Sequence, residues 1–93
     1  AYYFESLDFL AENRKLNAYY AEFEAAGASP LRKHQHAGVE FLYVVSGKLA
    51  LQIGEDEHEL AEGDAIYFES AVPHGYRKVG AHRTTALVVV VTD

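Results

Sequence analysis

The sequence contains no cysteine, methionine or tryptophan, and only two prolines in 93 residues. Without thiols, a disulfide framework, a thiolate zinc site and a cysteine nucleophile are all excluded. Any metal site must therefore be built from histidines and carboxylates. Because even an initiator methionine is missing, we expect the chain to be a piece of a longer polypeptide or a trimmed form of one.

Long apolar runs and an excess of positive charge are also missing. No stretch approaches the roughly 20 apolar residues that cross a bilayer, and no basic segment followed by an apolar one opens the chain. Eight Lys and Arg against fourteen Asp and Glu give a net charge of −6, which repels a phosphate backbone. We therefore expect a soluble, cytoplasmic protein without direct contact with nucleic acid or membrane.

The length is typical of one domain, and no linker divides it, so residues 1–93 are predicted to form a single unit. A chain of this size buries only about 60 to 65% of the surface that its unfolded form exposes. Some apolar surface is then left for a partner to cover. We therefore expect a homodimer.

Short runs of Val, Tyr, Phe, Leu and Ile, separated by glycines, predict an all-β fold. The predicted strands are 16–23, 39–45, 49–53, 58–60, 65–68 and 84–91. The segment 16–23 also contains several helix formers. Turns are predicted at 46–48, which would join two strands in a hairpin, and at 54–57 and 62–64. The nearly continuous apolar run 84–91 needs cover on both faces, which favours a closed barrel or sandwich.

Three potential metal ligands share even positions in the sequence. His34, His36 and Glu40 would face the same side of an extended chain if the turn at Gly38 preserves their phase. Glu40 interrupts an apolar strand, where an uncompensated buried carboxylate costs roughly 3 to 5 kcal/mol. A metal cation would compensate this charge, and a buried Arg32 is the alternative. Two imidazoles and a carboxylate suit a divalent transition metal.

The same residues resemble a known family. His34-Gln-His36-Ala-Gly-Val-Glu40, followed by Gly47, resembles the first cupin motif, His-x-His-x3-Glu-x6-Gly. The run from Gly63 to Phe68, followed by Val-Pro-His74-Gly, resembles the second. Lys78 stands where the family often has asparagine, a departure that affects the motif's turn rather than metal ligation.

The resemblance implies a small double-stranded β-helix, or jelly-roll barrel. Its core would span residues 30–92, with N-terminal strands in 1–29 packing on it or extending it. It also implies one bound divalent transition metal ion with the ligands His34, His36, Glu40 and His74. Zn, Ni, Fe, Mn and Cu all accept such ligands, so the identity of the metal stays open.

The amino-acid sequence around both motifs is similar to that of the C-terminal cupin sensor domain of bacterial helix-turn-helix regulators of the XRE type. That likeness implies a small-molecule effector, with the DNA-binding helix-turn-helix outside this chain. The alternatives are a stand-alone metal-dependent enzyme of the dioxygenase, isomerase or decarboxylase type, and a metal-free barrel that binds a ligand with the same side chains.

Strand phase also predicts the interior. Apolar side chains that share the phase of Glu40 or lie on the neighbouring strands should face inward: Leu42, Val44, Leu49, Leu51, Ile53 and Ile66 or Phe68. Phe41, Tyr43 and Val45 should face the opposite side. The predicted ligand pocket consists of Leu42, Tyr67, Phe68, Tyr76 and Arg77. His58 and His82 lie in polar segments and should be exposed. No further carboxylate or histidine remains to act as a general base, so no catalytic residue is assigned and the sensor is favoured.

Overall fold

The computed structural model describes residues 2–6, 16–24 and 35–91. These residues form eight strands and no helix: β1 (Tyr2–Ser6), β2 (Leu16–Phe23), β3 (Val39–Ser46), β4 (Lys48–Ile53), β5 (Asp56–Ala61), β6 (Ala65–Glu69), β7 (His74–Val79) and β8 (Thr84–Val91). The predicted all-β class is confirmed. Within this described part, no helix has the length and hydropathy needed to span a membrane.

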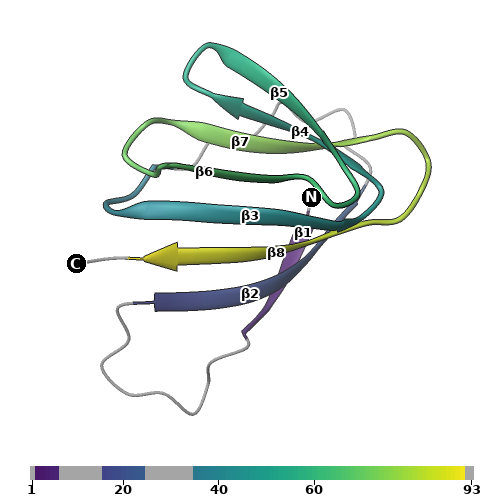
Figure 1. Ribbon diagram of the computed structural model, residues 1–93, viewed down its shortest axis with the longest axis horizontal. Helices are drawn as coiled ribbons and strands as arrows, with labels where there is room; N and C mark the ends of the chain where they lie inside the picture. Colours follow the sequence, from purple (N-terminus) through teal and green to yellow (C-terminus); the bar gives the residue numbers. More distant parts are fainter. Residues whose placement is uncertain (1, 7–15, 25–34, 92–93) are drawn as a thin grey trace.

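The strands form two antiparallel sheets that face each other (Figure 1). The larger sheet has the order β1-β2-β8-β3-β6, and the smaller one has the order β5-β4-β7. The N-terminal strands β1 and β2 therefore extend the larger sheet beyond β8. The predicted boundary at residue 29 lies outside the described residues and stays a prediction.

The link between β3 and β4 corrects one prediction. The turn at Gly47 was expected to make a hairpin, but β3 pairs with β6 and β8, whereas β4 pairs with β5 and β7. The chain crosses from one sheet to the other at this point. Gly47 has a positive φ of 79°, and a Cβ there would lie 2.3 Å from Thr84 Oγ1. Only glycine fits such a sharp corner against β8 without a clash.

The turn predicted at 54–57 is shorter than expected. Ile53 of β4 pairs directly with Asp56 of β5, so only Gly54 and Glu55 connect the two strands. Gly54 has a positive φ of 60°, which suits the two-residue turns that join antiparallel strands. The paired backbone keeps Asp56 and Glu57 in β5 despite the weak strand preference of acidic residues.

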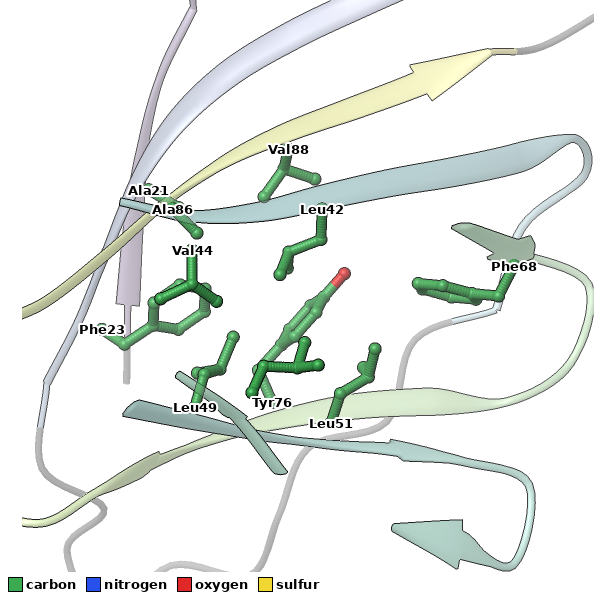
Figure 2. Close-up of a cluster of buried hydrophobic side chains, with 11 residues drawn as sticks. Ala21, Phe23, Leu42, Val44, Leu49, Leu51, Phe68, Tyr76, Ala86 and Val88 are labelled. Carbon is green, nitrogen blue, oxygen red and sulfur yellow. The ribbon is translucent and has the colours of Figure 1, made fainter. Parts of the chain in front are cut away.

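The hydrophobic core fills the space between the two sheets (Figure 2). Its buried members come from both sheets: Ala21, Phe23, Leu42, Val44, Leu49, Leu51, Leu60, Phe68, Tyr76, Ala86 and Val88. Ile53 and Ile66 pack against this cluster and are partly buried. Each fully buried Leu or Val contributes about 1.5 to 3 kcal/mol to folding.

Strand β3 alternates as its sequence predicts. Leu42 and Val44 are fully buried, whereas Phe41, Tyr43 and Val45 are exposed on the other side of the sheet. Because Glu40 shares the phase of Leu42, its carboxylate also faces the interior. The alternation therefore places a single acidic side chain at one end of the core.

Candidate metal centre

Three side chains from two strands and one connecting segment meet at one end of the core. Glu40 lies near the start of β3, His74 begins β7, and His36 lies in the segment before β3. One potential ligand atom from each side chain falls within 4.8 Å of those of the other two. The larger sheet supplies Glu40 and the smaller sheet supplies His74, so the site bridges the two layers.

The separations between these atoms fit a shared ion. Oε1 of Glu40 lies 3.3 Å from Nε2 of His36 and 3.5 Å from Nε2 of His74. Ligand atoms bonded at about 2.1 Å to one metal ion lie roughly 3 Å apart. The two imidazole rings meet edge to face, with centroids 5.2 Å apart. Two nitrogens and one carboxylate oxygen therefore already point toward a common position.

The ring of His74 is oriented by the backbone of its own turn. Its Nδ1 lies 2.9 Å from the carbonyl oxygen of Val72, so Nδ1–H donates to that oxygen in the neutral ring. Nε2 then carries the lone pair and faces Glu40. In metal-ligating histidines, the ring nitrogen that does not bind the metal commonly donates such a hydrogen bond. This bond fixes the tautomer in which the other nitrogen has a free lone pair for the metal.

Four effects act on the pKa of His74. Burial lowers it, but the hydrogen bonds to Glu40 and to the Val72 carbonyl, together with the negative charge of Glu40, raise it more. The net pKa of His74 is therefore raised above 6.5, the ordinary value for histidine. A positive charge is favoured at the centre of the site, as expected next to a buried carboxylate.

Glu40 is only 2% exposed. Its Oε2 is buried and makes no hydrogen bond with the described residues, and no described Lys or Arg pairs with it. A buried carboxylate in such surroundings needs compensation by a cation. Arg32, the alternative to a metal, lies outside the described residues. The donors present thus fit a divalent transition metal.

The position of His36 is set by hydrogen bonds to the turn after β6. The His36 amide donates to the Ser70 carbonyl at 3.0 Å, and the Ser70 amide donates to the Gly38 carbonyl at 3.0 Å. Gly38 has a positive φ of 100°, which glycine adopts without strain. This turn lets His36 approach Glu40. His34, the fourth predicted ligand, lies outside the described residues, and its role stays a prediction.

Apolar side chains surround the inner side of the three ligands. The ring centroid of His74 lies 4.9 Å from that of Phe68 and 6.1 Å from that of Tyr76. Leu42 and Leu51 are fully buried in the same core. Figure 2 shows the hydroxyl of Tyr76 directed into the space between the sheets. Leu42, Phe68 and Tyr76 therefore face the interior between the sheets, and their role in a ligand pocket stays a prediction.

The other two predicted pocket residues face outward. Tyr67 is 67% exposed on β6, one position out of phase with Phe68. Arg77 of β7 is exposed and pairs with Glu57 on the outer side of the smaller sheet. Side chains alternate along a strand, so neighbours of Phe68 and Tyr76 point away from the interior. We therefore leave Tyr67 and Arg77 out of the site. His58 and His82 are exposed, and neither belongs to the group of three ligands.

Ser70 is a residue near the site that the motifs do not identify. It is fully buried, and its Oγ makes no hydrogen bond with the described residues. Its side chain shares the inward phase of Phe68, two positions earlier. That phase was the available signal, because neither motif includes this position.

Comparison with known proteins supports the fold. The family model for the cupin domain matches residues 19–91. A search of curated protein sequences gives no match. The matched range contains His36, Glu40 and His74, together with strands β3 to β8 and most of β2.

Several solved structures share the fold. The cupin domain of an XRE-family transcriptional regulator from Enterobacter cloacae aligns with a TM-score of 0.85 at 22% identity, covering 100% of this chain and 98% of that one. An HTH_3-family transcriptional regulator from Vibrio cholerae aligns with a TM-score of 0.77 at 21% identity, covering 99% of this chain. HppE with Co(II) and substrate aligns with a TM-score of 0.78 at 21% identity, covering 96%. The alignment spans only 51% of each of the latter two proteins.

Proposed function

The chain belongs to the cupin domain family, and from this premise we propose that it binds one divalent transition metal ion through His36, Glu40 and His74. The observation that carries the proposal is the convergence of three donor atoms within 4.8 Å around a buried carboxylate. His34, two residues before His36, is the proposed fourth ligand. The bound ion would supply open coordination positions that can hold an oxygen- or nitrogen-bearing small molecule.

We further propose that the domain is the sensor of a transcriptional regulator, with the DNA-binding helix-turn-helix outside this chain. The end-to-end likeness to a regulator's cupin domain supports this assignment. The described interior around the ligands is apolar, with Leu42, Leu51 and Phe68 buried there. Such a lining suits binding better than acid–base chemistry, which needs a titratable group beside the substrate. An effector would act by binding one state of a homodimer more tightly than another.

A metal-dependent enzyme is the second candidate. The likeness to HppE, whose structure holds Co(II) and substrate, favours it. Tyr76 would be a candidate proton donor, since the centroid of its ring lies 6.1 Å from that of His74. The dioxygenase, isomerase and decarboxylase types remain open under this candidate.

The two candidates differ in the fate of the bound molecule. Metal-loaded protein and a Glu40→Gln variant would be screened by thermal shift against small carboxylates and amines. Any molecule that stabilises the wild type would then be incubated with it at length and recovered for mass spectrometry. Recovery unchanged is the result expected of a sensor. Conversion to a product by the wild type, but not by Glu40→Gln, would replace the sensor with the enzyme.

A further inference from the structure

Ser70 places an unpaired hydroxyl beside the proposed metal centre. Its side chain is fully buried, and its Oγ makes no hydrogen bond with the described residues. A buried hydroxyl without a partner is costly, and such groups in proteins nearly always bind a protein atom, a water or a ligand. A partner that does not belong to the described chain would satisfy this hydroxyl.

Two of the three proposed metal ligands are neighbours of Ser70. The Ser70 carbonyl accepts a hydrogen bond from the His36 amide at 3.0 Å. Phe68, two positions before Ser70, pairs directly with Glu40, and both Phe68 and Ser70 are buried. Ser70 and Glu40 are therefore diagonal neighbours on the inner face of the larger sheet, a relation in which residues lie about 7 to 8 Å apart. Side chains at this separation can contact the same small molecule.

The Ser70 hydroxyl and the Glu40 carboxylate do not bond to each other. Oε2 of Glu40 is buried and, like Ser70 Oγ, has no hydrogen-bond partner among the described residues. The hydroxyl proton is therefore available to a third atom. A molecule held beside Glu40 by the same ion would be in a position to present that atom.

The charges of the donor set indicate the sign of that molecule. A divalent ion brings two positive charges, the Glu40 carboxylate cancels one, and histidines bind metals in their neutral form. Among the described residues, Glu40 is the only buried acidic side chain. An uncompensated charge is costly in buried surroundings. A singly charged anion is therefore the ligand that completes the charge balance.

The surroundings of the site indicate the rest of the molecule. The ring centroid of Phe68 lies 4.9 Å from that of His74, and Leu42 and Leu51 are fully buried in the same core. None of the described Lys and Arg side chains is buried, so a second negative charge on the ligand would have no partner here. These residues favour an anion whose remaining part is apolar.

We propose that the Ser70 hydroxyl donates a hydrogen bond to the bound molecule, and that this molecule is a small monocarboxylate with an apolar remainder. The inference rests on the proposed metal-binding function and names the chemical class that the same site selects. A carboxylate has two oxygens, so one can bind the ion while the other accepts the hydrogen bond. Hydrogen bonds to charged acceptors are the stronger kind. A neutral nitrogen ligand gains nothing from Ser70, because its lone pair is used by the ion.

The test is a titration of the Co(II)-loaded protein with butyrate and with pyridine, followed by the visible absorption of the ion. The two probes are similar in size, but only butyrate keeps an acceptor oxygen for the hydroxyl. Ser70→Ala removes the hydroxyl. Ser46→Ala is the control, because Ser46 Oγ lies 2.7 Å from Thr85 Oγ1 at the other end of β3. We expect Ser70→Ala to bind butyrate about 10-fold more weakly than the wild type and pyridine equally well, and Ser46→Ala to match the wild type with both.

Four results would overturn the inference. A folded wild type that does not bind Co(II) would remove the proposed metal centre, and the inference with it. Co(II) binding with equal butyrate affinity in the wild type and Ser70→Ala would keep the metal centre and remove only the role of Ser70. A wild type that binds pyridine but not butyrate would contradict the carboxylate class. Equal weakening of both probes in Ser70→Ala would show a reshaped site instead of a lost hydrogen bond.

Discussion

At the scale of single residues, His74 joins the fold to the proposed chemistry. One nitrogen of its ring is held by the Val72 carbonyl at 2.9 Å, and the other faces Glu40 at 3.5 Å. The sequence predicted His74 as a ligand, because the second motif places a histidine after a proline. It did not predict the backbone hydrogen bond, which depends on how the turn before β7 folds back.

The raised pKa of His74 predicts how the stability of the metal-free protein changes with pH. The folded state binds this proton more tightly than the unfolded state, so the contribution is fully present below about pH 6.5 and is lost as the pH rises through the raised folded value. Thermal unfolding of the chelated wild type and of His74→Asn would be compared across this window. The wild type should gain stability relative to the variant as the pH falls. A difference that does not vary with pH would contradict the His74–Glu40 pairing.

Metal uptake should show the opposite pH dependence. The proton on His74 competes with the metal for Nε2, so affinity should increase as the pH rises through the raised pKa of His74. Competition titrations with a chromophoric chelator at several pH values would measure this affinity. The exposed His58 provides a control, because His58→Ala should leave the profile unchanged. An affinity independent of pH would argue against histidine ligands.

Ser70 gives another prediction at this scale. Its buried Oγ has no hydrogen-bond partner among the described residues, so removal of the hydroxyl should not cost a protein hydrogen bond. Ser70→Ala is therefore expected to change the free energy of unfolding by less than about 0.5 kcal/mol and to keep the metal. Urea unfolding measures the first quantity and elemental analysis the second. A loss of about 2 kcal/mol would mean that the hydroxyl has a partner elsewhere in the chain.

At the scale of elements, sequence patterns predicted strands better than their partners. The range of β2 and the start of β3 agree with expectation, because β-branched and aromatic residues at alternating positions favour extended chain. The expected hairpin between β3 and β4 was wrong, because a glycine turn looks the same whether the chain folds back or crosses to the other sheet. Only tertiary packing against Thr84 distinguishes the two at Gly47.

Gly47→Ala tests this corner. The positive φ costs an alanine about 1 kcal/mol, and the close approach to Thr84 Oγ1 and the Arg83 carbonyl adds overpacking of about 1 to 3 kcal/mol. Denaturant unfolding should show a loss of roughly 2 to 4 kcal/mol. Gly80 has a similar φ of 81°, but a Cβ added there would meet nothing within 4 Å. Gly80→Ala should therefore lose only the part of the free energy of unfolding that comes from the positive φ, about 1 kcal/mol. Equal losses in both variants would contradict the crossing corner.

At the scale of the whole molecule, the site exists because the two sheets close on each other. His36 and Glu40 are four residues apart, but His74 comes from the other sheet and is 34 positions further along the chain than Glu40. The family motifs could predict this meeting, whereas strand phase alone could not. The sequence also did not predict that Tyr67 and Arg77 face outward. Which side chains of β6 and β7 face the interior depends on the register of these strands with β3 and β4.

The oligomeric state is also a property of the whole molecule. The outward phase of Phe41, Tyr43 and Val45 was predicted from β3 alone and is confirmed. That Leu87 and Tyr67 extend the same surface depends on strand order, which the sequence does not reveal. The continuous apolar face therefore depends on the strand order, in which β8 and β6 lie on either side of β3.

The measurement that tests the proposed metal centre most directly is elemental analysis of protein purified without added metal or an affinity tag. The wild type would be compared with His74→Ala, and with His82→Ala as a control at an exposed histidine. We predict about one equivalent of a transition metal in the wild type and in the control, and a marked loss in His74→Ala. A folded wild type without metal, or a metal content that His74→Ala leaves unchanged, would contradict the site formed by His36, Glu40 and His74.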